Sequence, residues 1–245
     1  MKPLIIAHRG NNFSFPENSL NGLRSSFELG CMAVEFDIQM MADKNLVILH
    51  DPNTLRTSGQ DHSIFELTKE KLKDLSIYDP KRLGDTHIGT PLSLLSEFFP
   101  ILEEFPQGHA YVEVKYESLK QWGRQELLDE LLPMLTPYAK QCTVISFDIK
   151  VLEMIREQSG LSIGWVLNEH DEATKQTAEM VKPEYLIIDQ AEMPLTEAPW
   201  AGSWKWMVYG VKSADLAFQH YENGVEYVET DFLPRLLADP RLKPE

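Results

Sequence analysis

Two histidines near the start of the sequence each follow an apolar run and stand beside a charged residue. His8 ends the run LIIAH and precedes Arg9, and His50 ends the run LVILH and precedes Asp51. A pair of imidazoles can supply a base and an acid near neutral pH. The guanidinium of an arginine offers a fixed fork of donors to a phosphate group. These residues therefore point to acid–base chemistry on an anionic substrate.

Carboxylates occupy the ends of two further apolar runs. Glu35 and Asp37 are two residues apart in one run, and Glu113 and Lys115 have the same spacing in another. Residues two apart on a strand face the same side of the sheet, so each pair shares a face. Three converging carboxylates repel one another unless a cation lies between them. Oxygen ligands favour one hard divalent ion, Mg²⁺ or Ca²⁺, over zinc, and Lys115 offers a point charge to a phosphate.

The elements that must position these residues alternate between short apolar runs and helical patterns. Most of the runs are apolar throughout, as expected for strands that are covered on both faces. The predicted strands are residues 4–8, 33–39, 46–50, 110–115, 143–147, 163–168, 185–189, 207–211 and 225–231. The predicted helices are residues 19–29, 92–105, 119–138, 149–157, 172–181 and 214–223. Asn18 stands where an N-cap belongs, and Gly30 and Gly224 fit C-terminal stops.

Repeated strand–helix units predict a parallel sheet, and their number predicts a closed (β/α)₈ TIM barrel. Residues 46–50 follow 33–39 too soon for a crossover helix, so these two runs should form a hairpin. Residues 52–91 contain no strong strand and are expected to form a small insertion after that hairpin. Residues 191–205 are too short and Pro-rich for a full sixth helix. We expect residues 1–245 to form a single domain.

The bulk composition excludes several classes of partner. Lys and Arg number 23 against 38 Asp and Glu, a formal net charge of −15, which argues against non-specific nucleic-acid binding. No stretch approaches the roughly 18 apolar residues of a membrane span, and the N-terminus lacks a secretory pattern. Cys31 and Cys142 have no metal-ligand spacing and read as reduced core thiols. The expected location is cytoplasmic, the expected partner is a small molecule, and an oligomer is compatible with the sequence.

The ordered set of motifs closely resembles the glycerophosphodiester phosphodiesterase family. That family shows HRG, PEN, E-x-D, HD and E-x-K segments and a final G-V-D-x-x-x-T-D. The corresponding residues here are His8-Arg9-Gly10, Pro16-Glu17-Asn18, Glu35-Phe36-Asp37, His50-Asp51, Glu113-Val114-Lys115 and Gly224-Val225-Glu226 with Thr230-Asp231. Each motif alone is weak, but the order and spacing match over residues 4–234.

The resemblance implies a TIM barrel that hydrolyses glycerophosphodiesters to glycerol 3-phosphate and an alcohol. By the same resemblance Glu35, Asp37 and Glu113 would bind one divalent ion, His8 and His50 would form the acid–base pair, and Arg9 and Lys115 would hold the phosphate. The insertion would lie beside the glycerol end of the substrate. Pro16, Glu17 and Asn18 are expected to shape a loop, and Phe147 is expected to line the pocket.

The chain departs from the family pattern near its seventh barrel strand. Many members end that strand with Trp-Thr-Val-Asn, whereas this chain has Tyr209-Gly210-Val211-Lys212, so Tyr209 is expected to replace the Trp as a pocket wall. The alcohol, the ion, the assignment of base and acid, and the attacking group stay open. We take His8 as the base and His50 as the acid as a working hypothesis. Rival interpretations are a lysophospholipase D or a sphingomyelinase D-like lyase, a non-catalytic phosphodiester-binding protein, and a metal-dependent aldolase or isomerase on the same barrel.

Overall fold

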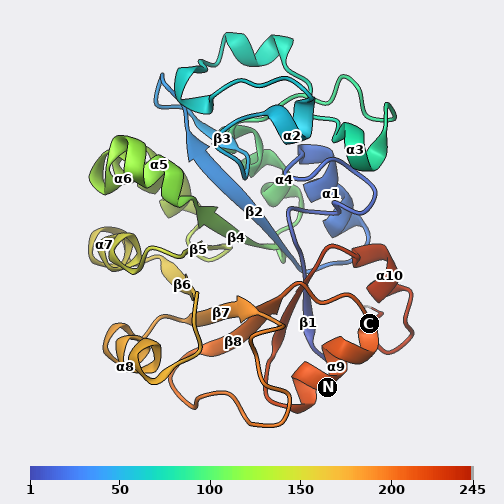
Figure 1. Ribbon diagram of the computed structural model, residues 1–245, viewed down its shortest axis with the longest axis vertical. Helices are drawn as coiled ribbons and strands as arrows, with labels where there is room; N and C mark the ends of the chain where they lie inside the picture. The colour runs from blue at the N-terminus through green and yellow to red at the C-terminus, as the bar shows by residue number, and fades with distance from the viewer. Residues whose placement is uncertain (244–245) are drawn as a thin grey trace.

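The computed structural model describes residues 1–243 and contains a closed barrel of parallel strands (Figure 1). Each barrel strand pairs in parallel with its two neighbours, and pairing of the first strand with the second closes the ring. The barrel strands, in the order they occur around the ring from the first, are β1 (Leu4–Ala7), β9 (Tyr227–Thr230), β8 (Lys205–Tyr209), β7 (Tyr185–Asp189), β6 (Ser162–Val166), β5 (Cys142–Ser146), β4 (His109–Val114) and β2 (Ala33–Met40). The prediction of a (β/α)₈ barrel is confirmed.

A short antiparallel strand extends one barrel strand beyond the ring. β3 (Leu46–Ile48) pairs with β2 in the register Ile38 to Ile48, as the short connection between the two runs predicts. This hairpin places His50 directly beside the carboxyl end of β2.

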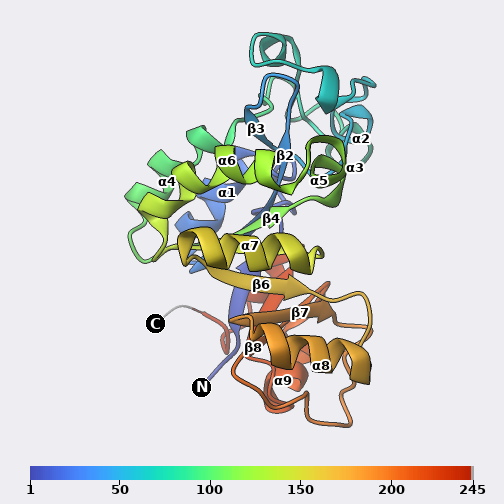
Figure 2. The same ribbon diagram turned by 90° about the vertical axis from the view of Figure 1, so that its left-hand side faces the viewer.

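Helices lie between successive strands and cover the outside of the barrel (Figures 1 and 2). The longer ones bury apolar residues against the strands in one large cluster. In chain order the helices outside residues 52–91 are α1 (Leu20–Glu28), α4 (Phe99–Glu104), α5 (Tyr116–Trp122), α6 (Arg124–Leu135), α7 (Ile149–Ser159), α8 (Glu172–Val181), α9 (Ala214–Glu222) and α10 (Leu233–Leu237), with 3₁₀ turns at Leu95–Glu97 and Thr136–Tyr138. As predicted, no helix lies between β7 and β8 among these described residues.

Three local predictions differ from the structure. The N-cap of α1 is Ser19, whose hydroxyl accepts from the Gly22 N–H, whereas Asn18 adopts a positive φ of 59° and turns its side chain to Asp37. The helix predicted over residues 119–138 is divided at Gly123, whose φ of 89° no helix allows. Over residues 92–105 only α4 and a 3₁₀ turn form, since Pro100 is tolerated in the first turn of a helix but not in its interior.

The insertion, residues 52–91, folds on a small core of its own at one end of the molecule (Figure 1, cyan). It contains α2 (Leu55–Ser58), α3 (Pro80–Leu83) and two 3₁₀ turns, Ile64–Glu66 and Lys71–Asp74. Apolar side chains of the insertion pack with Met41, Val47 and Leu49 of the hairpin; they are Ile64, Leu67, Leu72, Leu75 and Ile77. These residues are buried, so this segment offers core rather than an open acyl groove.

Alternation along the strands sorts side chains between the outside and the inside of the barrel. Val34, Phe36 and Ile38 of β2 join the cluster under the helices, whereas Ala33 joins a separate inner cluster with residues such as Ile6 and Tyr111. Glu35 and Asp37 share the inner face with Ala33. The pleat therefore turns the polar residues at the strand ends into the barrel.

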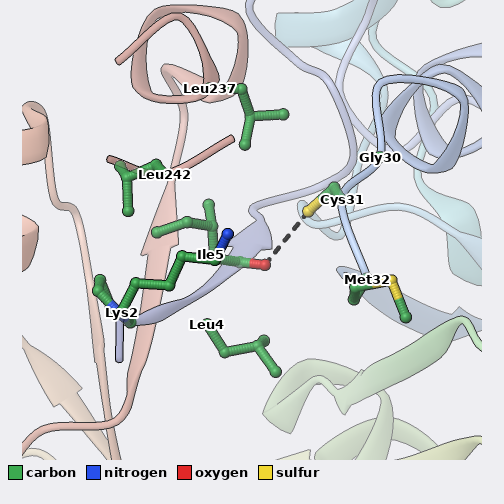
Figure 3. Close-up of a pocket in the computed structure, with 9 residues that line it drawn as sticks. Lys2, Leu4, Ile5, Gly30, Cys31, Met32, Leu237 and Leu242 are labelled. Carbon is green, nitrogen blue, oxygen red and sulfur yellow. Dashed lines mark hydrogen bonds between the residues drawn. The ribbon is translucent and has the colours of Figure 1, made fainter. Parts of the chain in front are cut away.

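A cavity of about 460 Å³ lies at the amino end of the strands, around the start of β1 and the loop before β2 (Figure 3). Its lining is mostly apolar, and the Cys31 thiol donates to the Ile5 carbonyl there at 3.2 Å. His8 stands at the other end of β1, so this cavity is separate from the predicted site.

Candidate active site

The carboxyl ends of the barrel strands surround a cavity of about 170 Å³. Eight of the nine site residues predicted from the sequence line this cavity: His8, Arg9, Glu35, His50, Glu113, Lys115, Phe147 and Tyr209. The other lining residues are Ile145, Val166, Ile187 and Glu229. The ninth, Asp37, is 1% exposed and contacts the Arg9 and Lys115 side chains. The fold thus brings the predicted residues together from the ends of five barrel strands and from the hairpin.

His8 is held between two carboxylates of the last barrel strand and the loop after it. Its Nδ1 lies 2.6 Å from Asp231 Oδ1, and its Nε2 lies 3.5 Å from Glu229 Oε1. The Asn12 amide also donates to Asp231 Oδ1 at 2.6 Å. Burial alone would lower the pKa of His8, but Glu229 and Asp231 outweigh it and raise that pKa above its usual value. His8 is therefore the more basic of the two histidines.

His50 has a similar carboxylate partner but a different charge environment. Its Nδ1 lies 2.6 Å from Asp51 Oδ1, so Nε2 is left for the cavity. Burial lowers the pKa of His50, and the nearby positive charges of Arg9 and Lys115 lower it further. Once protonated, His50 is the stronger acid of the two imidazoles.

Asp37 is the best-compensated carboxylate of the site. Arg9 Nε lies 3.2 Å and Lys115 Nζ 3.3 Å from its oxygens, and the Asn18 amide donates to Oδ2 at 2.9 Å. Burial would raise the pKa of Asp37, but Arg9 and Lys115 hold it well below its usual range. Asp37 is therefore ionised at neutral pH and ties both cations to β2.

Glu35 and Glu113 are less compensated than Asp37, although Lys115 Nζ also donates to Glu113 Oε1 at 2.8 Å. Burial and the charge of Asp37 raise the pKa values of both carboxyls, that of Glu35 strongly. Among residues 1–243, the buried Oε1 atom of Glu35 has no hydrogen-bond partner. One oxygen from each of Glu35, Asp37 and Glu113 lies within 4.8 Å of the others. This donor set fits a hard divalent cation, which would satisfy the orphaned oxygen.

A chain of ion pairs connects the cation Arg9 to the insertion. Arg9 Nη1 donates to Glu17 Oε1 at 2.9 Å, and Arg56 of α2 contacts both oxygens of Glu17, at 2.5 and 2.8 Å. Arg56 Nε also donates to Asp51 Oδ2 at 2.8 Å. The guanidinium of Arg56 thus holds both Glu17, the partner of Arg9, and Asp51, the partner of His50.

Two larger hollows flank the central cavity. On one side a cavity of about 710 Å³ shares His8 and Arg9 and reaches the insertion at Lys81 and Arg82. On the other a cavity of about 480 Å³ shares Glu113, Lys115 and Phe147. Phe147 therefore stands between the central cavity and the second hollow. Tyr209 also lines the central cavity, and burial raises the pKa of its hydroxyl to about 12, so this hydroxyl stays protonated at neutral pH.

Three polar residues at the site were missed from the sequence. Glu229 belongs to the final motif region, but only its inward register, two residues from Asp231, distinguishes it. Glu17 was expected only to shape a loop, although it is buried against Arg9. Arg56 lies in the insertion, and nothing in the local sequence shows that it reaches back to Glu17.

Among residues 1–243, no helix is both long and apolar enough to cross a bilayer. Cys31 and Cys142 are both buried and free, as predicted.

Curated relatives align with part of the chain. A glycerophosphodiester phosphodiesterase of Caldanaerobacter subterraneus is 32% identical over 102 residues, which is 42% of this chain and 41% of that protein. Glycerophosphodiester phosphodiesterase 1 of Bos taurus is 35% identical over 118 residues, which is 43% of this chain and 34% of that protein. The alignments thus span less than half the length of these relatives.

Solved structures resemble the whole fold. A phosphodiesterase from Oleispira antarctica in complex with the product sn-glycerol-3-phosphate matches with a TM-score of 0.84 and 22% identity, over 97% of this chain and 96% of that one. The glycerophosphodiester phosphodiesterase of Thermotoga maritima matches with a TM-score of 0.73 and 20% identity, over 95% and 96%. At these identities the likeness concerns the barrel fold.

The description of the family model that matches residues 8–233 is glycerophosphoryl diester phosphodiesterase family. This match covers most of the chain, including every predicted site residue. The chain belongs to the glycerophosphoryl diester phosphodiesterase family.

Proposed function

We propose that this protein, acting as one domain, hydrolyses glycerophosphodiesters to glycerol 3-phosphate and an alcohol. The observation that carries the proposal is the convergence of His8, His50, Arg9, Lys115, Glu35 and Glu113 on one cavity, with the Asp37 carboxylate buried beside them. A protein that only binds a phosphodiester needs cations but has no use for two oriented imidazoles.

The flanking cavities suit the two arms of a diester. The hollow beside the insertion would take the glycerol arm, and the hollow beside Phe147 would take the alcohol. The phosphate would then lie between Arg9 and Lys115. Both cations are anchored by Asp37, so their positions are set before the substrate arrives.

Glu35, Asp37 and Glu113 would hold one divalent cation, Mg²⁺ or Ca²⁺. When bound there, the ion supplies charge stabilisation for the phosphoryl oxygens. Arg9 and Lys115 add fixed positive charge on the same side of the cavity. The rival acyl-chain substrates gain no support, because the apolar residues of the insertion are buried in its own core.

We assign His8 as the base and His50 as the acid. The Nδ1 atom of His8 is engaged by Asp231, so Nε2 is placed to take a proton from the attacking hydroxyl. His50, with its lowered pKa, gives up a proton readily to the leaving alkoxide. The attacking hydroxyl is either water or the glycerol hydroxyl next to the phosphate, and only the second route makes a cyclic phosphate. Water opens the cyclic phosphate, so one solvent oxygen reaches the phosphate of the product by either route. Phosphorus NMR during a single turnover distinguishes the routes by detecting the cyclic phosphate.

The buried free thiols of Cys31 and Cys142 support a cytoplasmic location, since reducing compartments keep such groups reduced.

The first test is release of glycerol 3-phosphate from glycerophosphocholine and glycerophosphoethanolamine. Chelator-stripped protein is re-supplied with Mg²⁺ or Ca²⁺, with His8→Ala measured beside it. Cation-dependent release that is lost in His8→Ala supports the proposal. If neither ion restores release, lysolipid substrates are assayed next, and failure there too overturns the phosphodiesterase proposal in favour of a binding protein.

A further inference from the structure

Glu229 is a buried carboxylate that the proposed reaction does not use. It is 4% exposed, and among residues 1–243 no Lys or Arg nitrogen lies within 4.0 Å of its oxygens. Its one ion-pair contact in that part of the chain is His8 Nε2 at 3.5 Å. A buried carboxylate without a fixed cation is costly in free energy, so a positively charged partner is expected.

Glu35 faces the same point. Its Oε2 atom accepts from the Arg9 backbone N–H at 3.0 Å and lies 4.0 Å from His8 Nε2. Its buried Oε1 atom has no hydrogen-bond partner among the described residues. Ligand atoms of His8, Glu35 and Glu229 all lie within 4.8 Å of one another.

The orientation of His8 is that of a metal-bound histidine. Nδ1 lies against Asp231, which Asn12 also holds, so the lone pair of Nε2 can point towards Glu35 and Glu229. Histidine ligands to metals commonly donate their other ring N–H to a carboxylate in this way.

We propose that His8, Glu35 and Glu229 form a second divalent-cation site, separate from the group of three carboxylates, that selects Zn²⁺. One imidazole nitrogen and two carboxylates are a zinc donor set with a fourth position open. A tetrahedral site with bonds of about 2.05 Å has ligand atoms about 3.3 Å apart. The observed separations of 3.5 and 4.0 Å need only small side-chain shifts. Glu35 belongs to both groups and would bridge the two ions.

Zn²⁺ at this position would occupy the Nε2 lone pair that His8 uses as a base. The site would therefore be inhibitory, and this consequence alone rests on the proposed function. Binding itself depends only on the three side chains.

The test is the number of ions bound per chain when chelator-stripped protein is dialysed without substrate against Zn²⁺ together with Mg²⁺, which fills the site of the three carboxylates; elemental analysis counts each ion. We expect two ions per chain for the wild type and one for Glu229→Gln. Glu113→Gln should also bind one ion, because it removes a ligand from the site of Glu35, Asp37 and Glu113. Glu226→Gln, which changes an exposed carboxylate just before the same strand, should still bind two.

His8→Ala provides a second variant in case Glu229→Gln does not fold, and it should also bind one ion. A single bound ion in the wild type overturns the proposal, and so do two ions in both folded Glu229→Gln and His8→Ala. Inhibition of diester hydrolysis by Zn²⁺ should weaken at least 10-fold in Glu229→Gln. If no diester is hydrolysed at all, the proposed function fails while the stoichiometry still decides the second site.

Discussion

Arg56 and Asp51 form a two-pronged ion pair, with Nε 2.8 Å from Oδ2 and Nη2 3.0 Å from Oδ1. The same Asp51 holds Nδ1 of His50, so a residue of the insertion fixes the orientation of a histidine on the hairpin. The insertion therefore supports the site mechanically as well as lining the cavity beside it.

Arg56→Ala should lower kcat about 10-fold with a smaller change in KM. Without Arg56, Asp51 holds His50 less firmly, but His50 keeps its own proton. The expected loss is therefore smaller than the roughly 10²–10⁴-fold rate contribution of a complete acid–base group. Steady-state kinetics on glycerophosphocholine measure the changes in kcat and in KM separately. Arg24→Ala, which breaks a surface pair with Glu104, is the matched control. An effect on KM alone would show that Arg56 binds substrate instead.

His50→Ala should slow hydrolysis of glycerophosphocholine by about 10²–10⁴, because the choline alkoxide leaves without its proton donor. An activated nitrophenyl diester needs no such donor and should be slowed far less. Cation affinity, measured by calorimetry, should be unchanged, and exposed His62→Ala should leave both rates intact. Equal slowing of the two substrates would contradict the acid role.

Glu35→Gln should remove cation affinity and activity together, since Glu35 supplies the orphaned oxygen of the carboxylate group. The melting temperature gives a second readout, because an ion at about 100 times its Kd stabilises the folded state by about 2.7 kcal/mol. Chelator should therefore lower the melting temperature of the wild type. It should have no effect on Glu35→Gln, and a chelator response in that variant would place the ion elsewhere.

His109 should make the fold sensitive to acid, independently of the site. It begins β4 at the amino end of the barrel, and burial lowers its pKa to about 4 from the ordinary value of about 6.5. The unfolded chain binds this proton below about pH 6.5, whereas the folded chain does so only below about pH 4. Stability from His109 is therefore present above pH 6.5 and falls as the pH drops from there to about 4.

The variant that isolates this effect is His109→Gln, which keeps a partner for the Thr143 hydroxyl at the position of Nε2. Between about pH 6.5 and 4 its free energy of unfolding should fall by about 1–3 kcal/mol less than that of the wild type. Urea denaturation at a series of pH values measures the difference, with His62→Gln as the exposed control. If the free energies of unfolding of the wild type and of His109→Gln change in parallel with pH, His109 is not the source of the acid sensitivity.

The sequence was sufficient for the fold and the family because both depend on order along the chain. Apolar runs alternate with helical patterns, and a parallel sheet built from such units closes with its carboxyl ends at one mouth. The position of His8, Glu35 and Glu113 at strand ends therefore predicts that they meet, and all three line one cavity. Their chemical roles stay predictions.

Local rules were insufficient where a tertiary contact competes with them. Asn18 is a good N-cap by type, but its side chain binds Asp37 and leaves the cap to Ser19. Gly123 divides one long periodic segment into α5 and α6 because its positive φ turns the chain. Neither outcome follows from the spacing of apolar residues.

By itself the sequence determined which strand ends carry histidines and carboxylates, because the pleat and the parallel order of strands place them on one face. Only the tertiary structure decided which charges are compensated. Arg9 and Lys115 both contact Asp37, whereas Glu229 has only His8 as an ion-pair partner and the Oε1 atom of Glu35 has no hydrogen-bond partner among residues 1–243. Such pairing depends on distances of a few ångströms between residues as far apart in sequence as His8 and Glu229, which residue order alone does not set.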